Sequence, residues 1–163
     1  MSTSMNIDPS IFKAYDIRGV FPDTLNNEIA YRIGQGFVEV THPQGEVMVG
    51  QDVRLHSEEL KDNLVKGIID AGGNVVDVGI MSTDMLYFGV GNYKFAGGLQ
   101  STASHNPPEW HGFKMVEKGP TPMTLEKGIG QVRDFVLSDK KIAIETVGSV
   151  RKMDIWEDYA KYI

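Results

Sequence analysis

The chain has 163 residues, a formal net charge of -6, a pI near 5.2 and no cysteine. The acidic balance argues against a broad cationic surface for nucleic acid, and the lack of cysteine excludes disulfides, thiolate nucleophiles and sulfur-ligated metals. No apolar run approaches the ~20 residues that cross a bilayer, and residues 1–10 lack the pattern of a secretory signal, so we expect a cytoplasmic protein with no membrane or nucleic-acid partner.

The first half of the chain predicts two helices and two strands. Apolar residues recur at three- to four-residue steps over 24–40, which is one face of a helix. The run "EVMVG" at 46–50 is typical of a short buried strand. A second helix is expected to begin with Ser57 as its cap, with two glutamates in the first turn, and to end at the glycines 72–73. "NVVDVG" at 74–79 predicts the next strand.

The second half continues the alternation. A short helix over 83–94 is expected to be capped by Thr83, and "AGGLQST" at 96–102 predicts a third strand. "GFKMV" at 112–116 predicts a fourth strand, paired across the intervening loop, and 124–137 another helix. Strands that alternate with helices imply crossover connections. We therefore predict an α/β fold, a three-layer α/β/α domain with a mostly parallel, mixed sheet of about four strands.

The end of the chain has a different composition. "RKMDIWEDYAKYI" at 151–163 carries apolar residues at helical spacing and then stops. An apolar helical stripe normally packs on another element. We therefore expect residues 1–150 to form one domain and 151–163 to begin a truncated second domain.

The segment "GGLQSTASHNPPEW" at 97–110 is the most unusual stretch of the sequence. Its two prolines restrict the backbone, so Ser104, His105 and Asn106 are predicted to lie on a stiff loop. Considered alone, a Ser–His pair of this kind more often caps a turn than performs chemistry. In an α/β sheet, however, ligands gather beyond the carboxyl ends of the strands. The loops 51–56 and 102–111 both follow predicted strands and are expected to meet at that edge.

Two further segments place cations near the same edge. "FKAYDIRGVF" at 12–21 and "GQDVR" at 50–54 together supply two arginines and a lysine, although each could be an ordinary charged surface turn. The pair Gly34 and Gly36 lacks the third glycine of a dinucleotide fingerprint. The four histidines show no metal-ligand spacing on a single element, and Ser104 lacks the nucleophile elbow of an α/β-hydrolase.

Taken together, these segments resemble a known enzyme family. "TASHNPPEWHGFK" is similar to the phosphoserine loop of the α-D-phosphohexomutases, "FKAYDIRG" to the opening of the phosphomannomutase/phosphoglucomutase branch, and "GQDVR" to that family's G-x-D-x-R. The three motifs occur in the family's order and span residues 12–114. The resemblance covers essentially the whole chain as the family's amino-terminal domain.

The resemblance implies a reaction. In this family, phosphate moves reversibly between the 1 and 6 positions of a hexose through a phosphoserine and a hexose 1,6-bisphosphate. The partners would be mannose or glucose phosphates. The cofactor would be Mg²⁺, held by the Ser104 phosphate and by three aspartates of a further domain that is expected to be missing from this chain. We therefore interpret the chain as an amino-terminal fragment that is inactive alone. The alternative is a stand-alone, non-catalytic sugar-phosphate binding or interaction module.

Individual roles follow from matching the motifs position by position. Ser104 would carry the transferable phosphate, and Arg18 and Lys114 would hold its oxygens, Lys114 also moving a proton. His105 and Asn106 would orient the loop or donate to the phosphate. The weaker candidates are substrate-binding residues, namely Tyr15, Asn106 and Arg54.

The chain departs from the family pattern at two places. His111 stands where an asparagine is usual, so the shape of the loop can differ, and Ser82 and Asp84 stand where a common form has prolines. The choice between mannose, glucose and amino sugars, and the oligomeric state, stay open at this stage.

Overall fold

A mixed seven-stranded sheet forms the middle layer of the domain. The computed structural model describes residues 5–143 and 145–163. Within them the strand order is β1-β5-β4-β2-β3-β7, and β6 pairs with β5. The pairs β2–β4, β2–β3 and β3–β7 are parallel, whereas β5 is antiparallel to β1, β4 and β6. The strands are β1 (Ile17–Val20), β2 (Glu46–Gln51), β3 (Asn74–Ile80), β4 (Gly97–Ser101), β5 (Trp110–Glu117), β6 (Thr121–Pro122) and β7 (Val150–Lys152).

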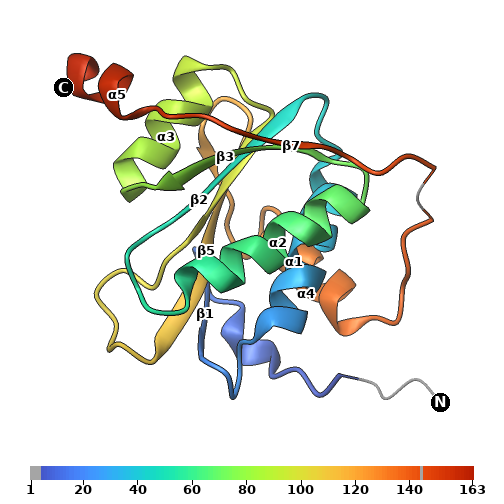
Figure 1. The fold of residues 1–163 in the computed structure, drawn as a ribbon. Coiled ribbons are helices and arrows are strands. Elements are labelled where there is room, and N and C mark those ends of the chain that lie inside the picture. The colour runs from blue at the N-terminus through green and yellow to red at the C-terminus, as the bar shows by residue number, and fades with distance from the viewer. Residues whose placement is uncertain (1–4, 144) are drawn as a thin grey trace.

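Helices cover both faces of this sheet. Figure 1 shows α1, α2 and α4 on one face and α3 and α5 on the other. The predicted three-layer α/β/α class is therefore confirmed. Among the described residues, none of the helices has the length and apolar character that a membrane span requires. The helices are η1 (Pro9–Ile11), α1 (Asn27–Thr41), α2 (Ser57–Asp70), α3 (Thr83–Asn92), α4 (Ile129–Leu137) and α5 (Trp156–Tyr162).

The sheet has three strands more than the four that the sequence predicted. All four predicted strands are present as β2, β3, β4 and β5. The additional strands β1, β6 and β7 have 4, 2 and 3 residues, which is too short for alternating hydrophobicity to be recognised. Since only β5 runs against the other six described strands, the sheet is mostly parallel in direction, as expected.

Two apolar cores lie on opposite faces of the sheet. The larger one packs α1, α2 and α4 against the sheet, and the smaller one lies under α3 and α5. Backbones of α1 and α2 come into direct contact at glycines. A Cβ on Gly67 would lie 2.0 Å from the carbonyl oxygen of Tyr31, and one on Gly34 would lie 2.2 Å from that of Leu64. Gly34 therefore allows the close packing of α1 against α2.

Besides α1, which begins at Asn27 instead of residue 24, three helix starts differ from the predictions. The cap of α2 is His56, because the Ser57 hydroxyl donates to the Asp52 carboxylate at 2.5 Å instead of capping the helix. The cap of α3 is Ser82, whose hydroxyl accepts from the Met85 amide, because the Thr83 hydroxyl donates to Gln100.

The third difference concerns α4. It begins at Ile129, because residues 124–128 form a turn in which the Lys127 amide donates to the Thr124 carbonyl and Gly128 has a φ of 105°.

The end of the chain packs on the sheet edge and the smaller core. β7 pairs in parallel with β3, with Val150 opposite Val75, and Figure 1 shows this segment running along β3 toward α5. Ile155 is fully buried within the smaller core. The predicted boundary after residue 150 falls inside β7, and the start of a second domain at 151–163 stays a prediction.

Candidate functional site

The loops that follow β2 and β4 meet at the carboxyl edge of the sheet. The Asp52 amide donates to the Ser101 carbonyl at 2.9 Å, which joins the first residue of one loop to the last residue of β4. The Thr102 amide donates to the Gly112 carbonyl at 2.9 Å and closes the base of the second loop. The predicted meeting of the two polar loops is therefore confirmed. It places Ser104 where ligands of α/β sheets are usually bound.

Ser104 lies in a tight turn with an unusual backbone conformation. Its φ is 52°, in the left-handed region that L-residues rarely occupy. The Ser104 amide donates to the Thr102 hydroxyl at 3.2 Å. Next in the turn, Asn106 donates to the Ala103 carbonyl twice, from its backbone amide at 3.1 Å and from its side-chain nitrogen at 2.7 Å. Thus the Asn106 side chain holds the turn, and the Ser104 side chain is exposed.

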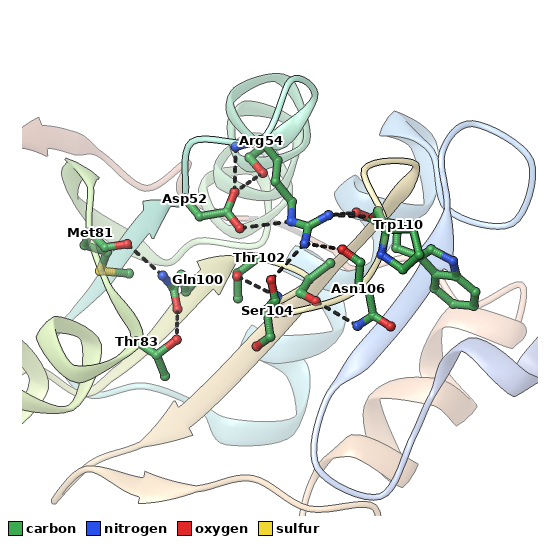
Figure 2. Close-up of polar contacts among 12 residues, drawn as sticks. Asp52, Arg54, Met81, Thr83, Gln100, Thr102, Ser104, Asn106 and Trp110 are labelled. Carbon is green, nitrogen blue, oxygen red and sulfur yellow. Dashed lines mark hydrogen bonds and ion pairs between the residues drawn. The ribbon is translucent and has the colours of Figure 1, made fainter.

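The Arg54 guanidinium fills the inside of this loop. Nη2 donates to the carbonyls of Ser104 at 2.8 Å and Asn106 at 2.6 Å. Nη1 donates to the carbonyls of Pro107 at 2.8 Å and Trp110 at 3.1 Å. Figure 2 shows the guanidinium at the centre of these contacts, with the Ser104 hydroxyl extending away from it. Arg54, predicted as a substrate-binding residue, thus has its donors turned to the protein backbone.

A carboxylate fixes the position of Arg54 in turn. Asp52 accepts from the Arg54 backbone amide at 3.0 Å and from the Ser57 hydroxyl at 2.5 Å, and its Oδ2 lies 3.5 Å from Arg54 Nε. These contacts tie the arginine to the first residue of α2. The loop around Ser104 is therefore anchored to a helix as well as to its own strands.

Two cations meet at a single buried carboxylate on the neighbouring strands. Asp16, just before β1, accepts from Arg18 Nε at 2.8 Å and lies 2.7 Å from Arg18 Nη2 and 3.8 Å from Lys114 Nζ. Both cationic side chains stay partly accessible, at 31% and 23% exposure. Since one carboxylate faces two cations, the group keeps a net positive charge. The arrangement could hold an anion without a broadly cationic surface.

Strand register relates this cationic group to the loop. Lys114 is the register partner of Gln100, so the two side chains lie on the same face of the sheet. Arg18 pairs with Gly112, two residues before Lys114, and therefore lies on that face too. A hollow of about 510 Å³ opens on this side, and its lining residues include Ser104, Asn106, Arg54 and Gln100.

The other two predicted residues lie in exposed positions. Tyr15 is 73% exposed in the turn before β1, and His105 is exposed beside Ser104. The structure therefore groups the seven candidate residues into a loop set and a cationic set. Their catalytic and binding roles stay predictions. The loop set comprises Ser104, His105, Asn106 and Arg54, and the cationic set Arg18 and Lys114, with Tyr15 in the adjoining turn.

Sequence reasoning missed two residues that shape the site. Gln100 is 1% exposed, and its amide nitrogen donates to the Met81 carbonyl at 2.8 Å while its oxygen accepts from Thr83 at 2.9 Å. Gln100 thereby connects the start of α3 to β4 at the side of the hollow. The other is Asp16, the shared acceptor of the two cations. A glutamine near the end of a short predicted strand, and an acid two positions before an arginine, were the available signals.

His111 lies in a buried aromatic cluster behind the loop. Its ring is completely buried and contacts Phe21 and His56 at centroid distances of 5.9 and 5.5 Å. Neither ring nitrogen has a hydrogen-bond partner among the described residues. Burial lowers the pKa of His111 below its ordinary value, and the nearby His56 and Arg54 lower it further. A neutral ring is therefore favoured at position 111.

The described residues do not form a metal site by themselves. Across 5–143 and 145–163, no three histidine, aspartate or glutamate side chains are grouped so that they could hold an ion. The acidic residues near Ser104 are already engaged, since Asp52 binds Arg54 and Ser57.

Comparison with known proteins gives a consistent result. Residues 9–138 match the family described as phosphoglucomutase/phosphomannomutase, alpha/beta/alpha domain I. A phosphomannomutase of Vibrio cholerae is 37% identical over 156 residues, which cover 93% of this chain and 34% of that protein. A phosphomannomutase of Klebsiella pneumoniae is 37% identical over 150 residues, covering 91% of this chain and 95% of that sequence.

A solved structure shares the fold. The chain superposes on a phosphoglucomutase/phosphomannomutase family protein from Burkholderia thailandensis with a TM-score of 0.86 and 33% sequence identity, covering 95% of this chain and 35% of the other. The chain thus spans about a third of the length of several of its matches, including the Vibrio cholerae and Escherichia coli phosphomannomutases, at 34% each.

Proposed function

Because the chain belongs to the phosphoglucomutase/phosphomannomutase family as its α/β/α domain I, we propose that it carries the phosphoserine of a phosphohexomutase. The reaction interconverts hexose 1-phosphate and hexose 6-phosphate through phosphorylated Ser104 and a hexose 1,6-bisphosphate. Relatives named phosphomannomutases support hexose phosphates as the substrate class. Since several relatives are about three times as long, the activity is proposed for a longer protein that contains these residues.

The observation that carries the proposal is the presentation of Ser104. Its hydroxyl is exposed beside the hollow on a turn whose backbone is fixed by Arg54 and Asn106. Phosphoryl transfer depends on alignment and charge stabilisation more than on covalent assistance from the protein. A rigid turn that presents one hydroxyl beside a hollow would supply that alignment.

The cationic set supplies the charge. A phosphoserine carries about -1.5 to -2 charges at neutral pH, which must be balanced. Arg18 and Lys114 lie on the same face of the sheet as Gln100, which lines the hollow, and both form ion pairs with Asp16. In the proposed step they hold the equatorial oxygens of the phosphoryl group. Their engagement with one shared carboxylate leaves donors of both side chains available.

The bonds change as follows. A hydroxyl oxygen of the sugar phosphate forms a bond to phosphorus while the bond from phosphorus to Ser104 Oγ breaks. The sugar hydroxyl gives up one proton and Ser104 Oγ gains one, and Lys114 is the proposed carrier of that proton. The reverse transfer, from the other end of the bisphosphate, regenerates the phosphoserine. His105, exposed beside Ser104, and Tyr15 are proposed to contact the phosphate or the sugar.

The described residues could supply only part of a magnesium site. The described residues would supply one ligand, the phosphate on Ser104, and they contain no cluster that completes the coordination shell. They do not fit the ion by themselves, and no step is assigned to it. We accordingly expect no turnover from the 163 residues alone.

The test follows the phosphoryl group itself. The longer protein is incubated with glucose 1,6-bisphosphate, and its intact mass and tryptic peptides are measured. We expect one added phosphoryl group, located on Ser104, and loss of both labelling and mutase activity in Ser104→Ala. The matched control is Ser10→Ala, an exposed serine of η1. Retained activity in Ser104→Ala would reject the proposed function.

A further inference from the structure

We propose that Arg54 is the positioning residue of Ser104, and that it acts on the loop backbone instead of on the substrate. The inference rests on the proposed function and assigns a role that the motif "GQDVR" did not reveal. Arg54 lies in a different loop from Ser104, yet one nitrogen of its guanidinium donates to the Ser104 carbonyl at 2.8 Å. It thereby contacts the peptide unit that directly follows the serine Cα.

The donors of Arg54 are all committed to the protein. A guanidinium has five N–H groups. Nη1 and Nη2 donate to four loop carbonyls at 2.6 to 3.1 Å, and the remaining donor, Nε, faces Asp52 Oδ2 at 3.5 Å. The side chain is 16% exposed. Binding of a substrate phosphate by Arg54 would therefore require release of part of the loop, which argues against its expected role as a substrate-binding residue.

The contacts also explain how the loop keeps its unfavourable backbone. A left-handed serine persists only where its surroundings impose the conformation. Hydrogen bonds from a charged donor are about twice as strong as neutral ones, and Arg54 makes four of them within one loop. The carbonyls of Ser104 and Asn106 converge on the same nitrogen. That convergence fixes the direction of the Ser104 Cα–Cβ bond.

The arginine is itself aligned by Asp52, which connects it to α2. Asp52 accepts from the Ser57 hydroxyl and from the Arg54 amide, so the first residue of the helix, the carboxylate and the guanidinium form one chain of contacts. A lysine at position 54 would offer a point charge with three donors in place of a planar fork. It could satisfy only some of the four carbonyls, and Arg54→Lys is therefore the informative change.

The first measurement concerns the loop alone and uses the 163-residue chain. Amide hydrogen exchange is followed at Ser104, Asn106 and Trp110, with the amides of α1 and α2 as the reference for global opening. In Arg54→Lys we expect loop exchange to rise ~10- to 100-fold while the reference amides are unchanged. The matched control is Arg133→Lys, the same change at an α4 arginine that pairs with Asp134; it should leave loop exchange at the wild-type rate.

The second measurement separates positioning from substrate binding. In the longer protein, Arg54→Lys should lower kcat by about 10²-fold and leave KM within about twofold, because the serine is displaced and no substrate contact is lost. A raised KM at unchanged kcat would return Arg54 to substrate binding and overturn the proposal. Unchanged loop exchange would overturn it as well.

Two further outcomes are distinguishable. If wild-type Ser104 accepts no phosphoryl group, the proposed function fails, and the exchange experiment still decides whether Arg54 orders the loop. If Arg54→Lys also opens α1 and α2, Asp52→Asn replaces it. This variant keeps the side-chain shape, removes the charge beside Nε, and must loosen the loop selectively for the proposal to stand.

Discussion

Replacing Ser104 by glycine should stabilise the protein, although the hydroxyl is the proposed centre of the chemistry. The φ of 52° costs an L-residue about 1–2 kcal/mol relative to glycine. Glycine also makes the unfolded chain more flexible, and this lowers the stabilisation by about 0.5–1 kcal/mol. The Ser104 side chain is exposed, so its removal costs little. We therefore expect Ser104→Gly to raise the free energy of unfolding by about 0.5–1 kcal/mol.

Urea unfolding of the 163-residue chain, followed by circular dichroism, measures this difference. Ser104→Ala is the control, because it removes the same hydroxyl and retains the Cβ that creates the strain; its stability should lie within about 0.5 kcal/mol of wild type. For a chain of this length 1 kcal/mol corresponds to a shift in Tm of about 2–4 °C. A glycine variant no more stable than the alanine variant would refute the assignment of strain to Ser104.

Three further predictions concern the scaffold. Gly67→Ala should destabilise the protein by about 3 kcal/mol or more, because the new Cβ would lie 2.0 Å from a carbonyl oxygen of α1. Gly91→Ala, on the exposed side of α3, should stabilise it by up to about 1 kcal/mol, because the nearest atom to the new Cβ would be 3.4 Å away. Urea unfolding of both variants measures these differences. Burial holds the pKa of His111 below its ordinary 6.5, so the unfolded chain binds more protons than the folded chain as the pH falls below that value, and the free energy of unfolding should fall with the pH. In His111→Asn, the dependence of the free energy of unfolding on pH should become shallower. This variant should keep the fold and change the mutase activity of the longer protein only modestly. Lys61→Met should cost about 1–3 kcal/mol, because the partly buried Asp77 carboxylate, whose Oδ2 lies 2.7 Å from Lys61 Nζ, would keep only its hydrogen bond from the Gly79 amide. An unchanged urea midpoint would contradict this.

The order of helices and strands was predictable because each long element carries its own periodic pattern. The apolar stripe of α1 and the continuous apolar run of β2 are local signals, and both elements are present as expected. Helix starts were less accurate, since hydroxyl groups near a start have competing partners. Ser57 would be a good cap in isolation, but it donates to Asp52, and that competition depends on a loop that only the folded sheet brings close.

The sequence predicted that the candidate residues lie near one edge of the sheet, but it did not predict what each of them contacts. The motifs place Ser104, Arg18 and Lys114 near one sheet edge, and the strand register puts the two cations on the same face. What each arginine contacts could not be read from the sequence. Arg54 and Arg18 both follow an aspartate by two positions, yet the first donates to four backbone carbonyls and the second shares its carboxylate with Lys114. The difference arises from tertiary packing alone.

The pairing of β1 with β5 has a consequence for the order in which the site can assemble. Ile17 lies opposite Phe113, so the first strand of the chain finds its neighbour in the sheet only when residues 110–117 have been synthesised. Contacts between positions so distant in sequence close large loops and form slowly. During translation, Arg18 therefore emerges long before Lys114, so the ion pair between Lys114 and Asp16 can form only late. The candidate site at this edge of the sheet is therefore completed only after β5 has been synthesised.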